Sequence, residues 1–313
     1  MLSAKNQKAN YRIIAYKMFR INSLILFFLL TCPGFGQKNM EIIAPGAKLE
    51  KLADGFLFTE GPAADAKGNV YFTDQPNDRI MKWSVDGELS TFMQPGGRSN
   101  GLYFDRQGNL WACADEKNEL WIITPEKKVT KIPGYFEGKL FNGPNDLWIS
   151  PAGGVFFTDP FYKRSWWNHT AMPQEKQCVY FLHTDHKTVD RVATDLVQPN
   201  GIVGSGDGKT LYVADIGGKK TWSYKIEKDG SLTNKTLFCE MGSDGITIDI
   251  KGNLYLTGKG VTIFDKSGKK IGTIDVPENW TANVCFGGKG RKTLFITASK
   301  SLYCMKMNVK GLR

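Results

Sequence analysis

The stretch Asp65-Ala66-Lys67-Gly68-Asn69-Val70-Tyr71-Phe72-Thr73-Asp74 places a glycine turn directly before a run of strand-forming residues. Similar stretches follow at 105–115, 150–159, 205–215, 249–257 and 288–297. The shared glycines are 38 to 55 residues apart: Gly68, Gly108, Gly153, Gly208, Gly252 and Gly290. A glycine turn between short strands supplies the positive φ that a hairpin needs. A period of this length with about four strands per repeat predicts an all-β fold, a six-bladed β-propeller.

The second repeat shows how four strands fit into one blade, with strands expected over residues 101–105, 110–114, 120–124 and 128–132. The last repeat ends after its third strand, residues 301–307. The segment Lys48–Ala53 precedes the first innermost strand and is free to supply the missing outer strand. We therefore expect an N-terminal strand to close the ring, which leaves few open sheet edges and suits a monomer.

Residues 1–36 read as a targeting segment. They carry five basic side chains and no acidic one, and an apolar run over 24–30 precedes small residues before Gln37. This is the three-part pattern of a secretory signal, and the run is short for a membrane span. We predict a signal peptide at 1–36, one propeller domain over 37–313, and export to the periplasm or the extracellular space. Cys32 raises a lipoprotein signal as an alternative, which is less favoured because Thr31 is a poor residue before an acylated cysteine.

Composition limits the partners. The chain has 313 residues, is 41% hydrophobic, and carries a formal net charge of +10, half of which lies in the targeting segment. No run of basic residues follows that segment, so nucleic-acid binding is not supported and a small-molecule ligand is expected. The five later cysteines are far apart in sequence and form no CxxC pair. We expect buried free thiols and no zinc site.

The repeat glycines also locate a candidate site at the mouth of the central channel. Eight residues before them, or seven in the last repeat, stand Glu60, Asn100, Asn145, Asn200, Asp244 and Asn283. Each has a side-chain oxygen and falls where an innermost strand should begin. Oxygen donors without His or Cys suit Ca²⁺ better than Zn²⁺ or Cu²⁺. The alternative is that Asn and Asp simply cap turns before strands. We assign that structural role to Asp74, Asp115, Asp159 and Asp215, which end the second strands.

Five stretches carry a family resemblance: Thr59-Glu60-Gly61-Pro62, Gly143-Pro144-Asn145-Asp146-Leu147, Phe156-Phe157-Thr158-Asp159-Pro160, Pro199-Asn200-Gly201-Ile202 and Ser243-Asp244-Gly245-Ile246. They resemble the family of gluconolactonase, senescence marker protein and luciferin-regenerating enzyme. The resemblance implies a six-bladed propeller with one divalent metal in its channel and hydrolysis of lactones. The metal would be Ca²⁺ or another divalent cation such as Mg²⁺, Mn²⁺ or Zn²⁺.

The resemblance also implies residue roles. Glu60, Asn200 and Asp244 would bind the metal, and Asn145 would be a fourth ligand or a substrate contact. Asp146 and Asn100 would lie near the substrate. The chain departs from the family pattern at 111–115 and 140–143, where the second stretch lacks a basic residue. These departures leave the identity of the lactone open.

The long loop at 161–176, between the second and third strands of the third repeat, should border the same mouth. Trp166 and Trp167 are candidates to stack on a sugar ring, with Arg98 beside them. Lys163, Arg164 or His169 of this loop could meet a carboxylate or an oxyanion. The alternative is that the two tryptophans only cover a neighbouring blade.

Two functions follow from these patterns. The first is a divalent-metal-dependent hydrolase that opens a sugar lactone, with a metal-polarised carbonyl and an activated water. Asp244, or less favourably Asp146, would remove the proton, and Asn145 would orient the ester. No Ser-His-Asp arrangement indicates an acyl-enzyme. The second is a non-catalytic secreted propeller that binds sugars or a partner protein and holds a structural calcium.

Overall fold

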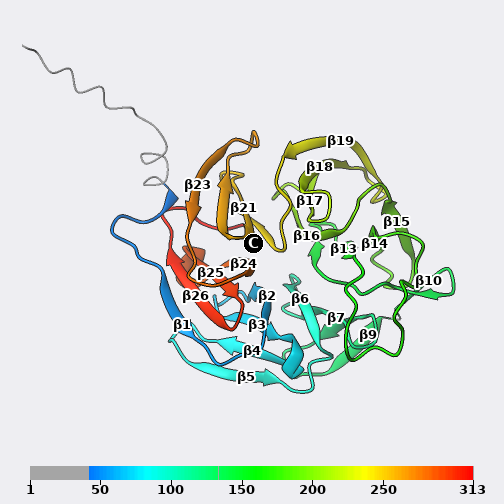
Figure 1. Ribbon diagram of the computed structural model, residues 1–313, viewed down its shortest axis with the longest axis horizontal. Helices are drawn as coiled ribbons and strands as arrows, with labels where there is room; N and C mark the ends of the chain where they lie inside the picture. Colours follow the sequence, from blue (N-terminus) through cyan, green and yellow to red (C-terminus); the bar gives the residue numbers. More distant parts are fainter. Residues whose placement is uncertain (1–41, 133, 313) are drawn as a thin grey trace, which may run out of the picture. The chain divides into compact units, whose positions relative to one another are not determined.

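The structure is a computed structural model that describes residues 42–132 and 134–312, and the targeting segment at 1–36 lies outside this range. Within it, six four-stranded antiparallel sheets surround a central channel (Figure 1). Blade 1 contains β2 (Thr59–Ala64), β3 (Val70–Asp74), β4 (Arg79–Trp83) and β5 (Leu89–Met93). Blade 2 contains β6 (Ser99–Phe104), β7 (Leu110–Ala114), β8 (Glu119–Ile123) and β9 (Val129–Ile132). The prediction of a six-bladed propeller is confirmed.

The remaining blades follow the same order from the inside outward. Blade 3 contains β12 (Leu147–Ile149), β13 (Val155–Asp159), β14 (Cys178–Leu182) and β15 (Val189–Ala193). Blade 4 contains β16 (Pro199–Gly204), β17 (Thr210–Asp215), β18 (Lys220–Ile226) and β19 (Leu232–Cys239). Blade 5 contains β20 (Ile246–Ile248), β21 (Leu254–Gly258), β22 (Gly260–Phe264) and β23 (Lys270–Ile274). Blade 6 contains β24 (Thr281–Gly287), β25 (Thr293–Ala298) and β26 (Ser301–Lys306), with β1 (Glu50–Ala53) outermost.

Short elements fill the connections. A two-stranded hairpin, β10 (Tyr135–Phe136) and β11 (Lys139–Leu140), precedes blade 3, and two 3₁₀ turns, η1 (Gln75–Asn77) and η2 (Lys289–Arg291), lie in blades 1 and 6. The six repeat glycines all have positive φ, between 71° and 95°. The turn chemistry therefore explains why this residue recurs in every blade. In the described part of the chain, no helix has the length and apolar character needed to cross a membrane.

An N-terminal strand closes the ring, as predicted. Strand β1 pairs antiparallel with β26, with Glu50 opposite Cys304 and Lys51 opposite Tyr303. In Figure 1 the blue strand β1 lies along the red strand β26, so the two ends of the chain meet in one blade. An isolated bridge between Ile43 and Met307 extends this contact. The outer edge of the last blade is therefore covered by the first part of the chain.

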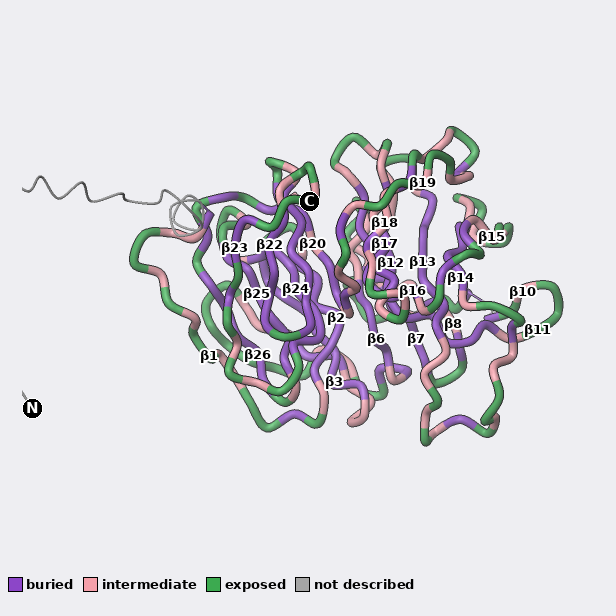
Figure 2. Tube along the Cα trace, turned by 45° about the horizontal axis from the view of Figure 1, so that its top comes forward, coloured by how far each residue is buried: buried purple, intermediate pink, exposed green. Residues whose placement is uncertain are grey.

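The core lies between the blades, where the faces of neighbouring sheets meet. The innermost strands are almost wholly buried and the outer strands are largely exposed (Figure 2). One cluster joins blades 1 and 6 through Phe72, Phe295 and Leu302. The described cysteines are all buried and free, as expected: Cys113, Cys178, Cys239, Cys285 and Cys304.

Candidate functional site

The front mouth is the end of the channel at which the innermost strands begin. Glu60, Asn100 and Asn200 are the second residues of β2, β6 and β16. Asn145 and Asp244 lie two residues before β12 and β20, because these two strands are only three residues long. Near Asn145 the backbone pairs across blades instead, since the Gly101 amide donates to the Asn145 carbonyl at 2.7 Å. The structure therefore brings five of the six predicted positions to one mouth.

Asp244 is held by hydrogen bonds to both carboxylate oxygens. The Asn200 Nδ2 donates to Asp244 Oδ1 at 2.8 Å, and the Trp280 indole Nε1 donates to Asp244 Oδ2 at 2.6 Å. The same Asn200 nitrogen lies 2.8 Å from the Tyr162 hydroxyl oxygen. These contacts fix the orientation of Asp244 from blades 4 and 6 and from the long loop of blade 3.

Glu60 is buried beside Asp244, and its carboxylate forms no ion pair with a described basic residue. Its side chain is 3% exposed, and its Oε2 accepts a 3.0 Å hydrogen bond from the amide of the next residue, Gly61. Burial, and then the nearby Asp244 carboxylate, raise the pKa of Glu60 well above its usual range. Burial also raises the pKa of Asp244 to about 6, against the hydrogen bonds from Trp280 and Asn200. A buried carboxylate beside a half-buried one, whose charge disfavours its ionisation, forms a site that a cation would stabilise.

The free oxygens at this mouth fit a hard divalent cation. Among the described residues the Asn100 and Asn145 side-chain amides make no hydrogen bond, and the Asn200 Oδ1 has no donor. No group of three or more His, Cys, Asp and Glu side chains in the described residues is placed to hold a metal. The candidate set instead combines two carboxylates with amide oxygens, a donor chemistry that suits Ca²⁺ or Mg²⁺ rather than Zn²⁺.

Asp146 and Asn283 lie deeper in the channel than the residues of the front mouth. Asn283 Nδ2 donates to Asp146 Oδ2 at 3.5 Å, and each side chain also accepts the backbone amide of the following residue. Burial raises the pKa of Asp146 to about 7. Asn283, the sixth predicted position, is the third residue of β24 rather than the second. It therefore lies deeper in the channel and contacts Asp146.

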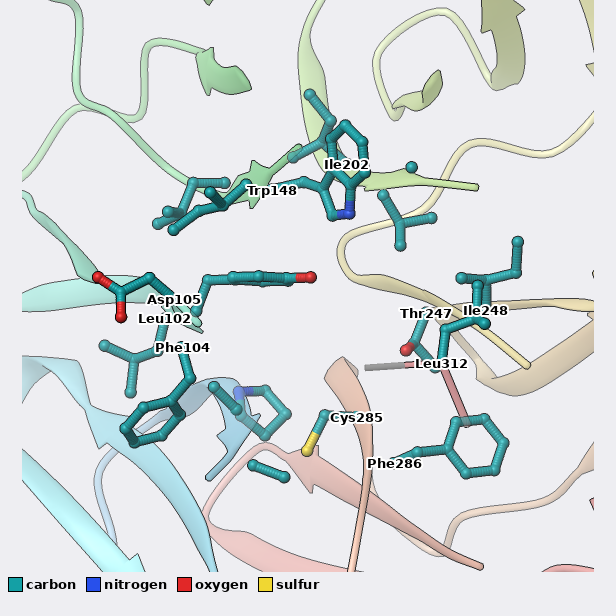
Figure 3. Close-up of a pocket in the computed structure, with 18 of the residues that line it drawn as sticks. Leu102, Phe104, Asp105, Trp148, Ile202, Thr247, Ile248, Cys285, Phe286 and Leu312 are labelled. Carbon is teal, nitrogen blue, oxygen red and sulfur yellow. The ribbon is translucent and has the colours of Figure 1, made fainter. Parts of the chain in front are cut away.

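A second hollow, the rear cavity, opens at the other end of the channel. It measures about 580 Å³, and Asp146 and Asn283 line it whereas Glu60, Asn200 and Asp244 do not. Figure 3 shows its walls, formed by later residues of the innermost strands and by the C-terminal Leu312. This rear cavity is thus distinct from the carboxylate pair.

The long loop of blade 3 reaches the front mouth through Tyr162, and its two tryptophans differ. Trp167 is buried: its Nε1 donates to the Asp115 carbonyl at 2.7 Å, and its ring stacks on His169 at 4.8 Å. These contacts favour the covering role for Trp167. Trp166 instead lies near two guanidinium groups, with its ring 4.8 Å from that of Arg98 and 5.5 Å from that of Arg164.

The aspartates that end the second strands behave as structural caps in three blades, as predicted. Asp74 accepts the amides of residues 57 and 58, Asp159 those of 142 and 143, and Asp215 those of 197 and 198. In each blade these amides lie just before the innermost strand. Asp115 is different, because its carboxylate accepts hydrogen bonds from the side chains of Arg164 and Gln75, at 2.9 and 3.2 Å.

Two residues of this site were missed by sequence reasoning. Trp280 stands inside Asn279-Trp280-Thr281, a match to a glycosylation pattern, and nothing local indicates that its indole reaches Asp244, 36 residues away. Tyr162 belongs to the loop that we expected at the mouth, but its contact with Asn200 spans 38 residues. The available signal was position: Trp280 directly precedes an innermost strand, as the loops at the mouth do.

Comparisons with known proteins agree with this geometry. The sequence profile described as the SMP-30/Gluconolactonase/LRE-like region matches residues 58–300. A gluconolactonase from Zymomonas mobilis is 29% identical over 307 residues, which cover 88% of this chain and 86% of that protein. A crystal structure assigned to a gluconolactonase superposes with a TM-score of 0.82 at 32% identity and covers 88% of this chain and 97% of its own. The Xanthomonas campestris gluconolactonase XC5397 gives 0.78 at 28% identity, with coverages of 85% and 91%.

Proposed function

Since the chain belongs to the SMP-30/gluconolactonase/LRE-like family and is a lactonase, we propose that it opens a sugar lactone with a divalent cation bound at the front mouth. The residues that would hold the cation are Glu60, Asn200 and Asp244, with Asn145 as a fourth ligand or a substrate contact. Calcium is the proposed ion because the donors are all hard oxygens, with Mg²⁺, Mn²⁺ or Zn²⁺ as substitutes. The observation that carries the proposal is the pair of the buried Glu60 and the half-buried Asp244, which lacks a basic partner in direct contact among the described residues.

The chemistry needs a polarised carbonyl and a base. A bound divalent cation supplies Lewis acidity toward the lactone carbonyl and lowers the pKa of an attacking water. Asp244 is the proposed proton acceptor. Its pKa of about 6 applies to the site without metal, and a bound cation would lower it and keep the carboxylate ionised at neutral pH. Trp280 and Asn200 each hold one of its oxygens, so the carboxylate keeps one orientation. Asp146 is the weaker candidate because its hydrogen bonds turn it toward Asn283.

The substrate would lie above this pair, at the front mouth. Asn145, whose side-chain amide is free of other described residues, is proposed to orient the ester oxygens, and Asn100 is proposed to assist it. Arg98, just before β6, and Trp166, from the long loop of blade 3, are proposed to form one wall of this mouth. Trp167 supports that wall from beneath through its bond to the Asp115 carbonyl.

Hydrolysis of a panel of sugar lactones, measured with and without a chelator, tests this proposal. We expect turnover of at least one aldonolactone, its loss on chelation and its return when Ca²⁺ is added back. Turnover that survives exhaustive chelation would remove the metal from the mechanism. Failure to hydrolyse any lactone in the presence of every candidate ion would refute the proposed function itself.

We also propose that the protein is exported and works as a monomer. The basic and apolar pattern of residues 1–36 supports export through a cleaved signal peptide, with Cys32 acylation as the alternative. Closure of the ring by β1 supports the monomer, because β1 pairs with β26 and gives the last blade the same four strands as the other blades. N-terminal sequencing of the mature protein and light scattering of the purified protein test these two proposals.

A further inference from the structure

A group of hydrogen-bond donors at the front mouth lacks acceptors. The Arg98 Nε and the Trp166 Nε1 are buried, and neither has a hydrogen-bond partner in the described part of the chain. The two side chains are in contact, with the Arg98 guanidinium 4.8 Å from the Trp166 ring. A buried donor without a partner is costly, so two of them side by side indicate a place for an acceptor.

Arg164 is the third member of this group. Its guanidinium lies 5.5 Å from the Trp166 ring and 5.3 Å from the Tyr162 ring. Its Nε donates to Asp115 at 2.9 Å, and its terminal nitrogens donate to no other described residue. The Arg164 guanidinium is therefore fixed through its Nε, and its two terminal nitrogens are free to donate. A pair of such parallel donors binds carboxylate or phosphate oxygens.

The donor group is connected to the carboxylate pair by a short chain of contacts. Tyr162, which packs under Arg164, places its hydroxyl 2.8 Å from Asn200, and Asn200 donates to Asp244. The positive charge of Arg164 also lowers the pKa of Glu60 and of Asp244, against the larger effect of burial. A ligand bound at Asp244 thus lies within reach of the Arg164 guanidinium.

The charge balance of the donor group is positive. Two guanidinium groups lie near Trp166, whereas Asp115 is the one carboxylate that pairs with either of them among the described residues. Arg98 instead uses its Nη1 on the Pro76 carbonyl, a neutral acceptor. Arg98 therefore has no ion-pair partner among the described residues.

We propose that Arg164 and Arg98 bind an anionic substituent of the substrate, so that the preferred substrate is a lactone carrying a carboxylate or a phosphate away from the ring carbonyl. This inference rests on the proposed lactonase function and assigns the substrate class of the same site. Both arginines are specificity-determining residues here: they bind the substituent and leave the ester to the groups around Asp244.

The test compares lactones that differ only in that substituent. The carboxylate arm pairs D-glucaro-1,4-lactone with D-glucono-1,4-lactone, and the phosphate arm pairs 6-phospho-D-glucono-1,5-lactone with D-glucono-1,5-lactone. We expect kcat/KM to be about 10- to 100-fold higher for the anionic member of at least one pair, the range typical of a charge-assisted hydrogen bond. Arg164→Gln should remove this preference, mainly through KM of the anionic lactone, and Arg98→Gln should reduce it.

Two further variants keep the result decisive. Arg106→Gln removes an equal charge at the rear cavity and should leave the preference unchanged. The double variant Asp115→Asn/Arg164→Gln removes the buried ion pair as a unit, so that a loss of preference is not caused by a stranded carboxylate. Equal kcat/KM within both pairs, or an equal loss on the neutral and the anionic lactone in Arg164→Gln, would overturn the inference.

A failure of the proposed function would be recognised separately. If no lactone is hydrolysed, calorimetric titration with the same unconsumed 1,4-lactones measures binding directly. Tighter binding of the glucaro-lactone that is lost in Arg164→Gln would support the anion site without the activity. Equal binding of both lactones would refute it.

Discussion

Replacing Asp244 by Asn should make the protein without metal more stable at neutral pH. Asn keeps the size of the side chain, and its Oδ1 can still accept from Trp280. In the variant, the new Asn side chain has an NH₂ donor where Asp244 Oδ1 accepts the hydrogen bond from Asn200. The side-chain amide of Asn200 must therefore flip, so that its oxygen accepts from this donor. The hydrogen bonds survive this exchange, and the main change is the loss of one negative charge beside Glu60.

The magnitude follows from the pKa of Asp244. Folding raises this pKa from 3.8 to about 6, so the folded protein binds the proton more tightly than the unfolded chain does. The free energy of unfolding therefore falls as the pH rises through the window between these values, and it stays lower above pH 6. A shift of this size corresponds to about 3 kcal/mol at most, and partial solvent access at the mouth reduces it to about 1–2 kcal/mol.

Thermal unfolding with EDTA at pH 4.0 and pH 7.5 measures this effect. At pH 7.5 we expect Asp244→Asn to unfold about 2–8 °C above the wild type, since 1 kcal/mol shifts the Tm of a chain of this size by about 2–4 °C. At pH 4.0 the wild-type carboxyl is largely protonated, and the difference should shrink. Added Ca²⁺ should raise the Tm of the wild type much more than that of the variant.

An exposed carboxylate provides the control. Asp86 lies on a surface hairpin and makes no hydrogen bond to the described residues, so Asp86→Asn should leave the Tm unchanged at both pH values. A lower Tm for Asp244→Asn in EDTA at pH 7.5 would refute the idea of two uncompensated carboxylates. An equal rise in Tm with Ca²⁺ in both proteins would remove Asp244 from the ligand set.

Three further predictions test the ring and its site. Deleting residues 37–54 removes β1 from β26 and should lower the Tm of the whole propeller in one transition, and an unchanged Tm would contradict closure by this strand. Trp280→Phe loses the indole hydrogen bond to Asp244 and should weaken Ca²⁺ binding about tenfold by calorimetry, whereas Trp222→Phe on the outer part of blade 4 should not. Asn145→Ala should keep Ca²⁺ binding while kcat falls about 10²- to 10³-fold, and full turnover would exclude an orienting role for this amide.

The sequence alone predicted what depends on local repetition. The turn glycines specify where each hairpin bends, and counting back from them places Glu60, Asn200 and Asp244 at one mouth because every blade has the same strand order. The same count placed Asn283 too near the mouth, since Asn283 is the third residue of β24, whereas Glu60, Asn100 and Asn200 are the second residues of their strands. Contacts between blades could not be predicted: those of Tyr162 and Trp280 with the site depend on how two loops fold over the channel.

The exception among the structural aspartates links the fold to the proposed substrate. In blades 1, 3 and 4 the carboxylate at the end of the second strand is used up by two backbone amides of the preceding loop. In blade 2 the loop before the innermost strand uses a different carboxylate, because the backbone amides of Gly96 and Arg98 both donate to Asp78. The strand register explains this, because Ala114 lies opposite Ser99 where Asp74 and Asp215 lie opposite Thr59 and Pro199, and Asp115 follows one residue beyond the capping position. Its carboxylate is then free to hold the Nε of Arg164.

The burial of Asp115 gives its ion pair with Arg164 a property that a surface ion pair lacks. Asp115 is 2% exposed, so the Arg164 guanidinium is drawn to a fixed and buried anchor rather than left to move in solvent. An arginine that is ordered before the substrate arrives loses less conformational entropy on binding an anion. The same reasoning predicts that Arg164→Lys restores the charge without the preference, because lysine has no Nε–H for Asp115 and no planar fork. If Arg164→Lys kept the full preference for anionic lactones, charge alone would account for it and the anchor at Asp115 would be irrelevant to specificity.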